Sequence, residues 1–498
     1  MLTERVKPIA RILAEGSDEK HGLRRSLNGW TLAAMGVGCI IGTGIFVLTG
    51  VGSATRAGPA LTISFVIAGI VAGLAALCYA EVSSKVPISG SAYTYTYATV
   101  GEFFAWVVGW ALVLEYALGA GTVSVGWSGY FTNILHTLRI WDIPQAWQHS
   151  HWDPMPGIAN LPAAAIILII TALLVKGTRE SGTFNAIIVT FKVAIVLFFI
   201  AIGVGHIDPA NYHLPPGPAT GAGGYFPFGW GGVLGGAAFM FFAYIGFDAV
   251  STTAEEARNP ARDLPFGIIL SLAVCTVLYI IVVAILDGMV PFNHLNVAFP
   301  VAFAVNSVGL TWAGTLISFG AIAGLTTVLL VQMYGQTRVF YAMSRDGLIP
   351  PLFVRLHPAW RTPWMSQIFF GLAIAAAGAF FPIGVLVSLC NMGTFLAFIL
   401  VAIAVPLLRN RHPELRGSFT LPFGPYVIPA LAALSALGMM YYLRVGNPVV
   451  WGFFPLAWLG FIVWFVVGLI FYFAYGRNKS TVALQTVERL AIRQPEVN

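Results

Sequence analysis

Two glycine-rich segments carry most of the chemistry that this sequence can offer. The first is Gly36-Val-Gly-Cys-Ile-Ile-Gly-Thr-Gly44, and the second runs from Gly235-Gly236 to Gly246. Glycine is a poor helix former, so each segment predicts an interrupted helix with exposed backbone N–H and C=O groups. Such N–H groups favour a carboxylate and such C=O groups favour an ammonium, so the pair would suit a zwitterionic amino acid. Close helix packing is the alternative use of these glycines.

Two ionisable residues stand out because apolar sequence surrounds them. Lys192 lies in Thr-Phe-Lys-Val-Ala-Ile-Val, and Glu115 lies in Gly-Trp-Ala-Leu-Val-Leu-Glu-Tyr. A charge at bilayer depth is costly, so it usually has a function or a partner. Lys192 could exchange a proton, or it could extend its ammonium to the membrane surface. Glu115 could attract a cationic substrate, tune proton affinity, or hydrogen-bond to a neighbouring helix.

Composition defines the elements that must position these residues. The 498 residues are 58% hydrophobic and only 9% charged, against about 25% charged in soluble domains. This predicts an all-α polytopic membrane protein in a lipid bilayer and excludes a soluble enzyme or a nucleic-acid binder. We expect twelve transmembrane helices of about 20 residues, near 30–50, 61–83, 103–124, 161–178, 184–205, 231–252, 266–289, 312–342, 366–381, 383–407, 425–443 and 450–475.

The positive charges predict the orientation of these spans. With the N-terminus inside, 22 of the 26 lysines and arginines lie on the inner side. The outer side holds only Arg56, Arg139 and Arg444, and Lys192 lies within the membrane. This is the positive-inside pattern. It predicts a multi-pass protein of the cell membrane with both termini cytoplasmic.

The spacing of the two glycine segments predicts an internal repeat. Gly42 and Gly246 are 204 residues and five predicted spans apart. Because five is odd, a second copy would insert upside down, which predicts a 5 + 5 inverted repeat followed by two extra helices. A 6 + 6 arrangement would place its boundary in the short segment between predicted spans 6 and 7. The expected divisions are a tail at 1–28, repeats at 29–205 and 230–407, two spans at 425–475, and a tail at 476–498.

Four motifs resemble those of the amino acid–polyamine–organocation transporters, above all the cationic amino acid transporter branch and its bacterial relatives. They are Gly38-Cys-Ile-Ile-Gly-Thr-Gly-Ile-Phe46, Gly109-Trp-Ala-Leu-Val-Leu-Glu-Tyr116, Glu255-Glu-Ala-Arg-Asn-Pro-Ala-Arg-Asp-Leu-Pro265 and Arg338-Val-Phe-Tyr-Ala-Met-Ser-Arg-Asp-Gly347. The resemblance covers all twelve predicted spans. It implies the LeuT fold and secondary transport of L-amino acids by alternating access.

The resemblance also implies a set of binding residues. The substrate carboxylate would meet the N–H groups of Thr43 and Gly44. Ile40 and Ile41 would flank this helix break. The ammonium would meet the C=O groups of Phe242, Ala243 and Ile245, and Glu115 would lie in the same site.

Ion coupling is implied by one further match. Lys192 resembles the span 5 lysine that replaces sodium in proton-coupled relatives, with Thr326 and Thr327 of span 8 as its expected polar neighbours. This implies proton symport without a cofactor, a bound metal or catalytic residues. Exchange or facilitated diffusion without proton coupling, and a channel, are the alternatives. The sequence does not choose between neutral and cationic amino acids, and it is compatible with a monomer.

Overall fold

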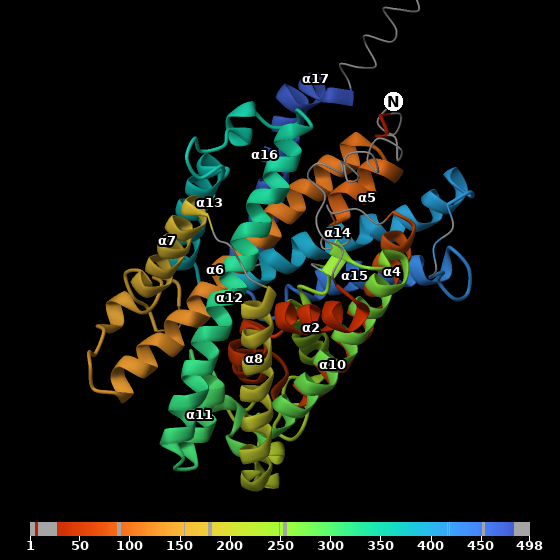
Figure 1. The fold of residues 1–498 in the computed structure, drawn as a ribbon. Coiled ribbons are helices and arrows are strands. Elements are labelled where there is room, and N and C mark those ends of the chain that lie inside the picture. The colour runs from red at the N-terminus through yellow and green to blue at the C-terminus, as the bar shows by residue number, and fades with distance from the viewer. Residues whose placement is uncertain are drawn as a thin grey trace, which may run out of the picture.

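Long apolar helices make up most of the protein in the computed structural model (Figure 1). The structure describes residues 5–7, 27–86, 91–153, 155–177, 182–248, 250–251, 256–415, 417, 419–450 and 454–482. Seven described helical segments are long and apolar enough to cross a membrane. They are Gly44–Lys85, Glu102–Thr137, Ile187–His206, Pro260–Met289, Thr311–Arg345, Ile383–Arg411 and Leu456–Lys479.

Five shorter apolar helical segments accompany them: Gly29–Ile40, Leu161–Lys176, Gly229–Tyr244, Trp364–Phe380 and Val427–Tyr442. The all-α polytopic class is therefore confirmed. Several boundaries differ from the sequence prediction: the helix expected at 103–124 continues to Thr137, and the last one begins at Leu456 rather than at 450. The segment expected at 30–50 is divided between a short helix and the long run that begins at Gly44, and the segment expected at 231–252 stops being regular after Tyr244.

The elements have the following bounds. The α-helices are α2 Gly29–Ile40, α3 Thr49–Gly52, α4 Leu61–Lys85, α5 Ser91–Thr99, α6 Glu102–Thr137, α7 Leu161–Lys176, α8 Gly182–Gly203, α9 Gly229–Met240, α10 Pro260–Met289, α11 Pro300–Ser307, α12 Thr311–Arg345, α13 Trp364–Phe380, α14 Ile383–Arg411, α15 Val427–Tyr442, α16 Leu456–Phe471 and α17 Arg477–Lys479. The π-helical turns are η1 Gly44–Leu48, η2 Ser53–Ala57 and η11 Tyr472–Gly476. The 3-10 turns are η3 Gly58–Ala60, η4 Gln145–Trp147, η5 Val204–His206, η6 Pro209–His213, η7 Phe241–Tyr244, η9 Phe292–His294 and η10 Pro351–Val354. Strands β1 Val449–Val450 and β2 Phe454–Pro455 pair antiparallel.

Small residues allow these helices to approach closely. Helix α6 packs against α12 and α14, while α10 packs against α4 and α2. Lipid tails are as apolar as leucine, so helices in a membrane associate through close packing rather than through hydrophobic burial. Gly393 of α14 illustrates this, because a methyl group added there would lie 2.9 Å from the Ala111 carbonyl oxygen of α6.

The two ends of the described chain meet in a partly buried cluster, here called the terminal cluster: Arg5, Lys7, Glu102, Asp346 and Arg477. The Arg5 guanidinium pairs with Glu102 at 3.3 Å and donates to the Arg477 carbonyl at 2.8 Å. The Lys7 ammonium pairs with Asp346 at 3.1 Å. Both chain ends therefore lie on one side of the bundle. Helices α17 and α11 lie at its opposite ends (Figure 1).

Candidate functional site

The first helix break lies where the sequence places its glycines. Helix α2 ends at Ile40, and Ile41 adopts an extended backbone with φ −70° and ψ 103°. Thr43 is again helical and leads into η1. The Gly42 carbonyl accepts hydrogen bonds from the N–H groups of Ile45 and Phe46 in the following turn, each at 3.3 Å. The N–H groups of Gly42, Thr43 and Gly44 thus stand at the start of a half-helix, where the preceding turn cannot supply regular acceptors.

The second break follows α9 and η7. Ile245 is extended, with φ −58° and ψ 133°, and Gly246 has φ +118°, a conformation that side chains disfavour. The carbonyls of Phe242, Ala243 and Ile245 therefore lie at the end of a half-helix. The Phe242 carbonyl already accepts the Ile245 N–H at 3.2 Å, which leaves one of its lone pairs unused.

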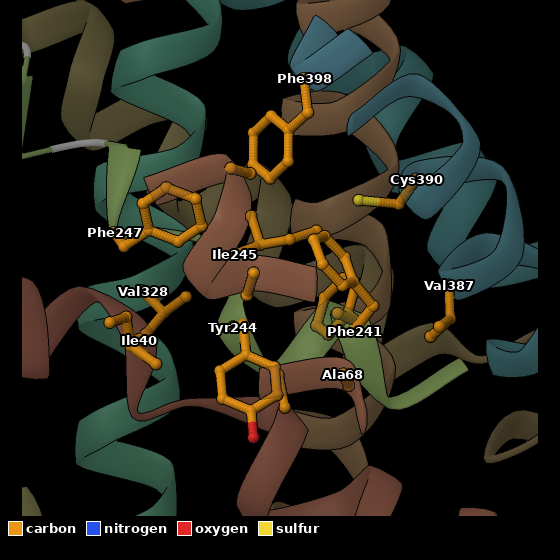
Figure 2. Close-up of a cluster of buried hydrophobic side chains, with 14 of the residues drawn as sticks. Ile40, Ala68, Phe241, Tyr244, Ile245, Phe247, Val328, Val387, Cys390 and Phe398 are labelled. Carbon is orange, nitrogen blue, oxygen red and sulfur yellow. The ribbon is translucent and has the colours of Figure 1, made fainter. Parts of the chain in front are cut away.

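The two breaks contact each other directly, and glycine makes this possible. A methyl group added at Gly44 would lie 2.4 Å from the Cα atom of Ala243. One added at Gly246 would lie 3.0 Å from the carbonyl oxygen of Cys39. Figure 2 shows Ile40 of the first break and Ile245 of the second in the same cluster of buried side chains. The structure therefore brings the predicted N–H and C=O groups to one place, with the N-terminal end of one half-helix beside the C-terminal end of another.

Three side chains hydrogen-bond to carbonyls near the broken ends. The Tyr279 hydroxyl of α10 donates to the Ile40 carbonyl at 2.8 Å. Asn391 of α14 donates to carbonyls in the last turn of α9, including that of Ala238 at 2.8 Å. The Lys192 ammonium donates to the Gly38 carbonyl at 2.9 Å. Sequence reasoning missed Tyr279 and Asn391, because nothing in their local sequence indicates a partner in another helix.

Lys192 lies at the junction of α2, α8 and α12. It is only 2% exposed. Its ammonium reaches α2, and its stem packs on α12, where a methyl group added at Gly324 would lie 3.2 Å from Cγ. The Thr326 hydroxyl donates a hydrogen bond to a carbonyl of its own helix and accepts one from a tryptophan indole of α6. The Thr327 hydroxyl donates to the Gly324 carbonyl. Within the described residues, neither hydroxyl is hydrogen-bonded to Lys192.

Glu115 lies in α6 on the other side of the second break. It is 2% exposed, and neither carboxyl oxygen has a hydrogen-bond partner among the residues that the structure describes. Asp248, just beyond the break, is near enough to interact with it electrostatically. The hydroxyls of Tyr79 and Tyr95 are buried without partners in the same described region, and both residues interact electrostatically with Asp248. Buried polar groups without partners are rare, so this polar region can accept a ligand or water.

Apolar side chains form the walls around the crossing of the two breaks. Figure 2 shows Phe241 and Phe247 of the second break, Val328 of α12 and Phe398 of α14 in one cluster of buried side chains. A methyl group added at Gly42 would lie 3.2 Å from Val328. The site therefore combines polar backbone ends with an apolar surrounding, which is typical of a site for a small molecule with both polar and apolar parts.

Paired helix breaks at the centre of a membrane-crossing bundle define a membrane transporter. The chain matches the family model described as "Amino acid permease" over residues 27–478, and it belongs to that family. It is 46% identical to the methylthioribose transporter of Bacillus subtilis (strain 168) over 476 residues, 96% of this chain and 98% of that one. It is also 46% identical to the branched-chain amino acid permease BcaP of the same organism over 484 residues, with the same coverage.

A plant relative is more distant. The vacuolar cationic amino acid transporter 4 of Arabidopsis thaliana is 40% identical over 403 residues, which cover 80% of this chain and 65% of that protein. The resemblance to amino acid transporters is thus confirmed, and the chain is a permease rather than an enzyme.

Proposed function

We propose that this protein is a proton-coupled amino acid symporter that works by alternating access. The contact between the two helix breaks, Gly44 against Ala243, carries the proposal. Five predicted spans separate these breaks, which supports a LeuT-like inverted repeat of twelve helices with two spans outside it. A channel needs a continuous pore, whereas two crossed half-helices suit a site that opens to one side at a time.

The substrate backbone would bind between the broken ends. Its carboxylate would accept from the N–H groups of Thr43 and Gly44, at the positive end of a helix dipole. Its ammonium would donate to the carbonyls of Ala243 and Ile245, and to the remaining lone pair of Phe242. Ile40 and Ile41 would border this site. The close approach of the two breaks supports this assignment, because both ends of one zwitterion must reach both helices.

Lys192 would bind the coupling proton. Its ammonium holds the Gly38 carbonyl at 2.9 Å, one turn before α2 breaks. A charged lysine donates a strong hydrogen bond to a helix end, and a neutral amine donates a weaker one. Loss of the proton would therefore loosen α2 from α8 and α12, and the same movement would alter the substrate site. This link between protonation and the position of a half-helix is what symport requires.

Neutral apolar amino acids are the proposed substrate class. The walls around the crossing are apolar (Figure 2). Glu115, with Asp248 near it, is the acid that a cationic side chain would need, so arginine belongs in the same test. The 46% identity to a branched-chain permease, against 40% to a cationic transporter, favours the neutral apolar class. The equally similar methylthioribose transporter makes that sugar a necessary member of any substrate panel.

Both termini would face the cytoplasm. Arg5 contacts Arg477 directly, so the two chain ends lie on one side. The excess of lysine and arginine on that side supports an inner location under the positive-inside rule.

The test is uptake into proteoliposomes with an acidic exterior and no sodium. Labelled leucine, alanine, arginine and methylthioribose would be compared with and without a protonophore. We expect leucine to accumulate and the protonophore to abolish accumulation. Equal uptake under both conditions would refute symport in favour of exchange or facilitated diffusion, and absence of counterflow would favour a channel.

Two lysine variants would test the proton site. Lys192→Ala should lose accumulation but retain exchange of internal for external substrate. Lys176→Ala is the matched control, because Lys176 is exposed at the end of α7. Normal accumulation by Lys192→Ala would remove Lys192 from the coupling mechanism.

A further inference from the structure

Asp287 is a buried acid that the proposed mechanism does not use. It lies in the last turn of α10, at the end far from the terminal cluster, and it is 0% exposed. Neither carboxyl oxygen has a hydrogen-bond partner among the described residues, and no described cation forms an ion pair with it. Such isolation requires an explanation, because a buried acid is normally paired.

Two groups from other elements lie against this carboxyl. Ser53 of η2, in the second half of the first span, is beside it, and the Ser53 hydroxyl is itself buried without a partner in the described structure. Tyr212 of η6 covers the same turn of α10 and donates to the Ala284 carbonyl at 2.7 Å. Burial raises the pKa of the Tyr212 phenol.

No cation on the adjoining elements reaches Asp287. The Arg56 guanidinium, one turn from Ser53, lies over the ring of Phe239 at 4.8 Å. The other titratable or charged groups on the elements packed against α10 are Cys39 of α2, Cys78, Tyr79, Glu81 and Lys85 of α4, Lys192 of α8, His206 of η5, Tyr212 and His213 of η6, and Tyr244 of η7.

The proton is the ligand that suits this environment. An ionised carboxylate that is buried with no cation and with only the Ser53 hydroxyl as a donor is strongly unfavourable. A neutral acid needs only an acceptor for its O–H, and the Ser53 oxygen is next to it. Ionisation would instead need further donors such as water, and separation of Ser53 from Asp287 would make room for it.

We propose that Asp287 is a second proton-binding site, distinct from Lys192, that is occupied when the second half of the first span is closed against α10. This proposal depends on the proposed function in one respect: the proposed orientation makes the Asp287 end of α10 the outer end. Ser53 lies on the helix that carries the Thr43 and Gly44 N–H groups, so proton binding at Asp287 links closure of the outer end to the substrate site. Acid outside would favour the closed form, and alkali outside would favour the open form.

Infrared difference spectroscopy of the full-length protein in lipid vesicles tests the site without transport. A protonated carboxyl has a C=O stretching band that a carboxylate lacks. Asp287→Asn should remove one such band from the neutral-pH spectrum. Asp208→Asn is the matched control, because Asp208 is an exposed acid at the same end, hydrogen-bonded to Ala210, and its removal should leave the band unchanged. An Asp287→Asn spectrum with the same carboxylic band as the wild type would overturn the proposal.

A second variant covers the case in which Asp287→Asn does not fold. Asp287→Thr also removes the acid, and it should lose the same band. Lys192→Ala should keep the band, because the two sites are separate. A protein that fails to accumulate amino acids but shows the Asp287 band would refute symport and support this site. A protein that accumulates amino acids but shows no band assignable to Asp287 would support symport and refute the Asp287 site.

Discussion

The contact between the two helix breaks predicts a severe effect for the smallest possible substitution. In Gly44→Ala, the new methyl group would lie 2.4 Å from both the Cα and Cβ atoms of Ala243. Carbon atoms pack at about 3.5–4.0 Å, so the two backbones would have to separate by about 1 Å. Ala243 Cα is backbone and cannot rotate away. Overpacking of this kind costs about 1–3 kcal/mol, and we expect about 2 kcal/mol of lost stability.

Two other glycines provide matched controls. Gly42→Ala would place its methyl group 3.2 Å from a terminal carbon of Val328, which a small rotation can relieve. Gly73→Ala in α4 meets no atom within 4 Å and should be neutral or slightly stabilising. The midpoint of thermal unfolding and the uptake rate at low substrate concentration would be measured for all three.

We expect Gly44→Ala to lose most in both measurements. Uptake should fall at least about tenfold, because displacement of both ends of the binding site should cost more than about 1.4 kcal/mol of affinity. Gly42→Ala should lie between the other two variants. If Gly44→Ala unfolds and transports like Gly73→Ala, the two breaks do not touch as described, and the binding-site assignment is wrong.

Three further predictions concern the scaffold. Glu81→Gln should lower the free energy of unfolding by about 3 kcal/mol, since Glu81 accepts two hydrogen bonds from Arg409 at 2.6 Å; a double-mutant cycle with Arg409→Gln should show strong coupling. Tyr279→Phe should cost about 1 kcal/mol and raise the substrate KM, because the Ile40 carbonyl loses its 2.8 Å partner; unchanged unfolding and KM would contradict this. Tyr212→Phe should remove a phenol that ionises above the ordinary tyrosine range in ultraviolet titration, since the pKa of Tyr212 is raised. A raised pKa gives stability that is complete below the unfolded-state value and is lost as pH rises through the folded-state value, so the variant should lose less stability than the wild type in alkali.

Hydropathy and glycine spacing predicted the helical class and the positions of both breaks. In lipid every backbone polar group must be satisfied internally, so long apolar runs become helices with little influence from tertiary context. The breaks were visible because Gly42, Gly44 and Gly246 interrupt such runs. Their direct contact was not predicted, because nothing in either segment specifies the distance between two backbones.

The partners of these groups were not predictable from the sequence. Lys192 stood out as a charge among apolar residues, but its partner is the carbonyl of Gly38, 154 positions away, and a backbone carbonyl has no sequence signature. Tyr279 lies 239 positions from the Ile40 carbonyl, and an aromatic residue in an apolar run is indistinguishable from ordinary core. Arg56 was assigned to the outer side from its charge alone, and its burial at 3% exposure against Phe239 was not predicted.

The terminal cluster has a consequence for biosynthesis. Arg5 contacts the Arg477 carbonyl, 472 positions along the chain, and Glu102 also accepts the hydroxyls of Tyr472 and Ser480. A ribosome makes the N-terminal partners of these contacts first. It makes their C-terminal partners last. The cluster is therefore complete only after residues 472–480 have been made, although Arg5 and Lys7 can already bond to Glu102 and Tyr97. Glu102, an acid that is 0% exposed in the finished protein, lacks its C-terminal partners until then. A chain that ends before residue 472 would lack the Tyr472 and Ser480 donors to Glu102, so we expect such a chain to be less stable at this end of the bundle.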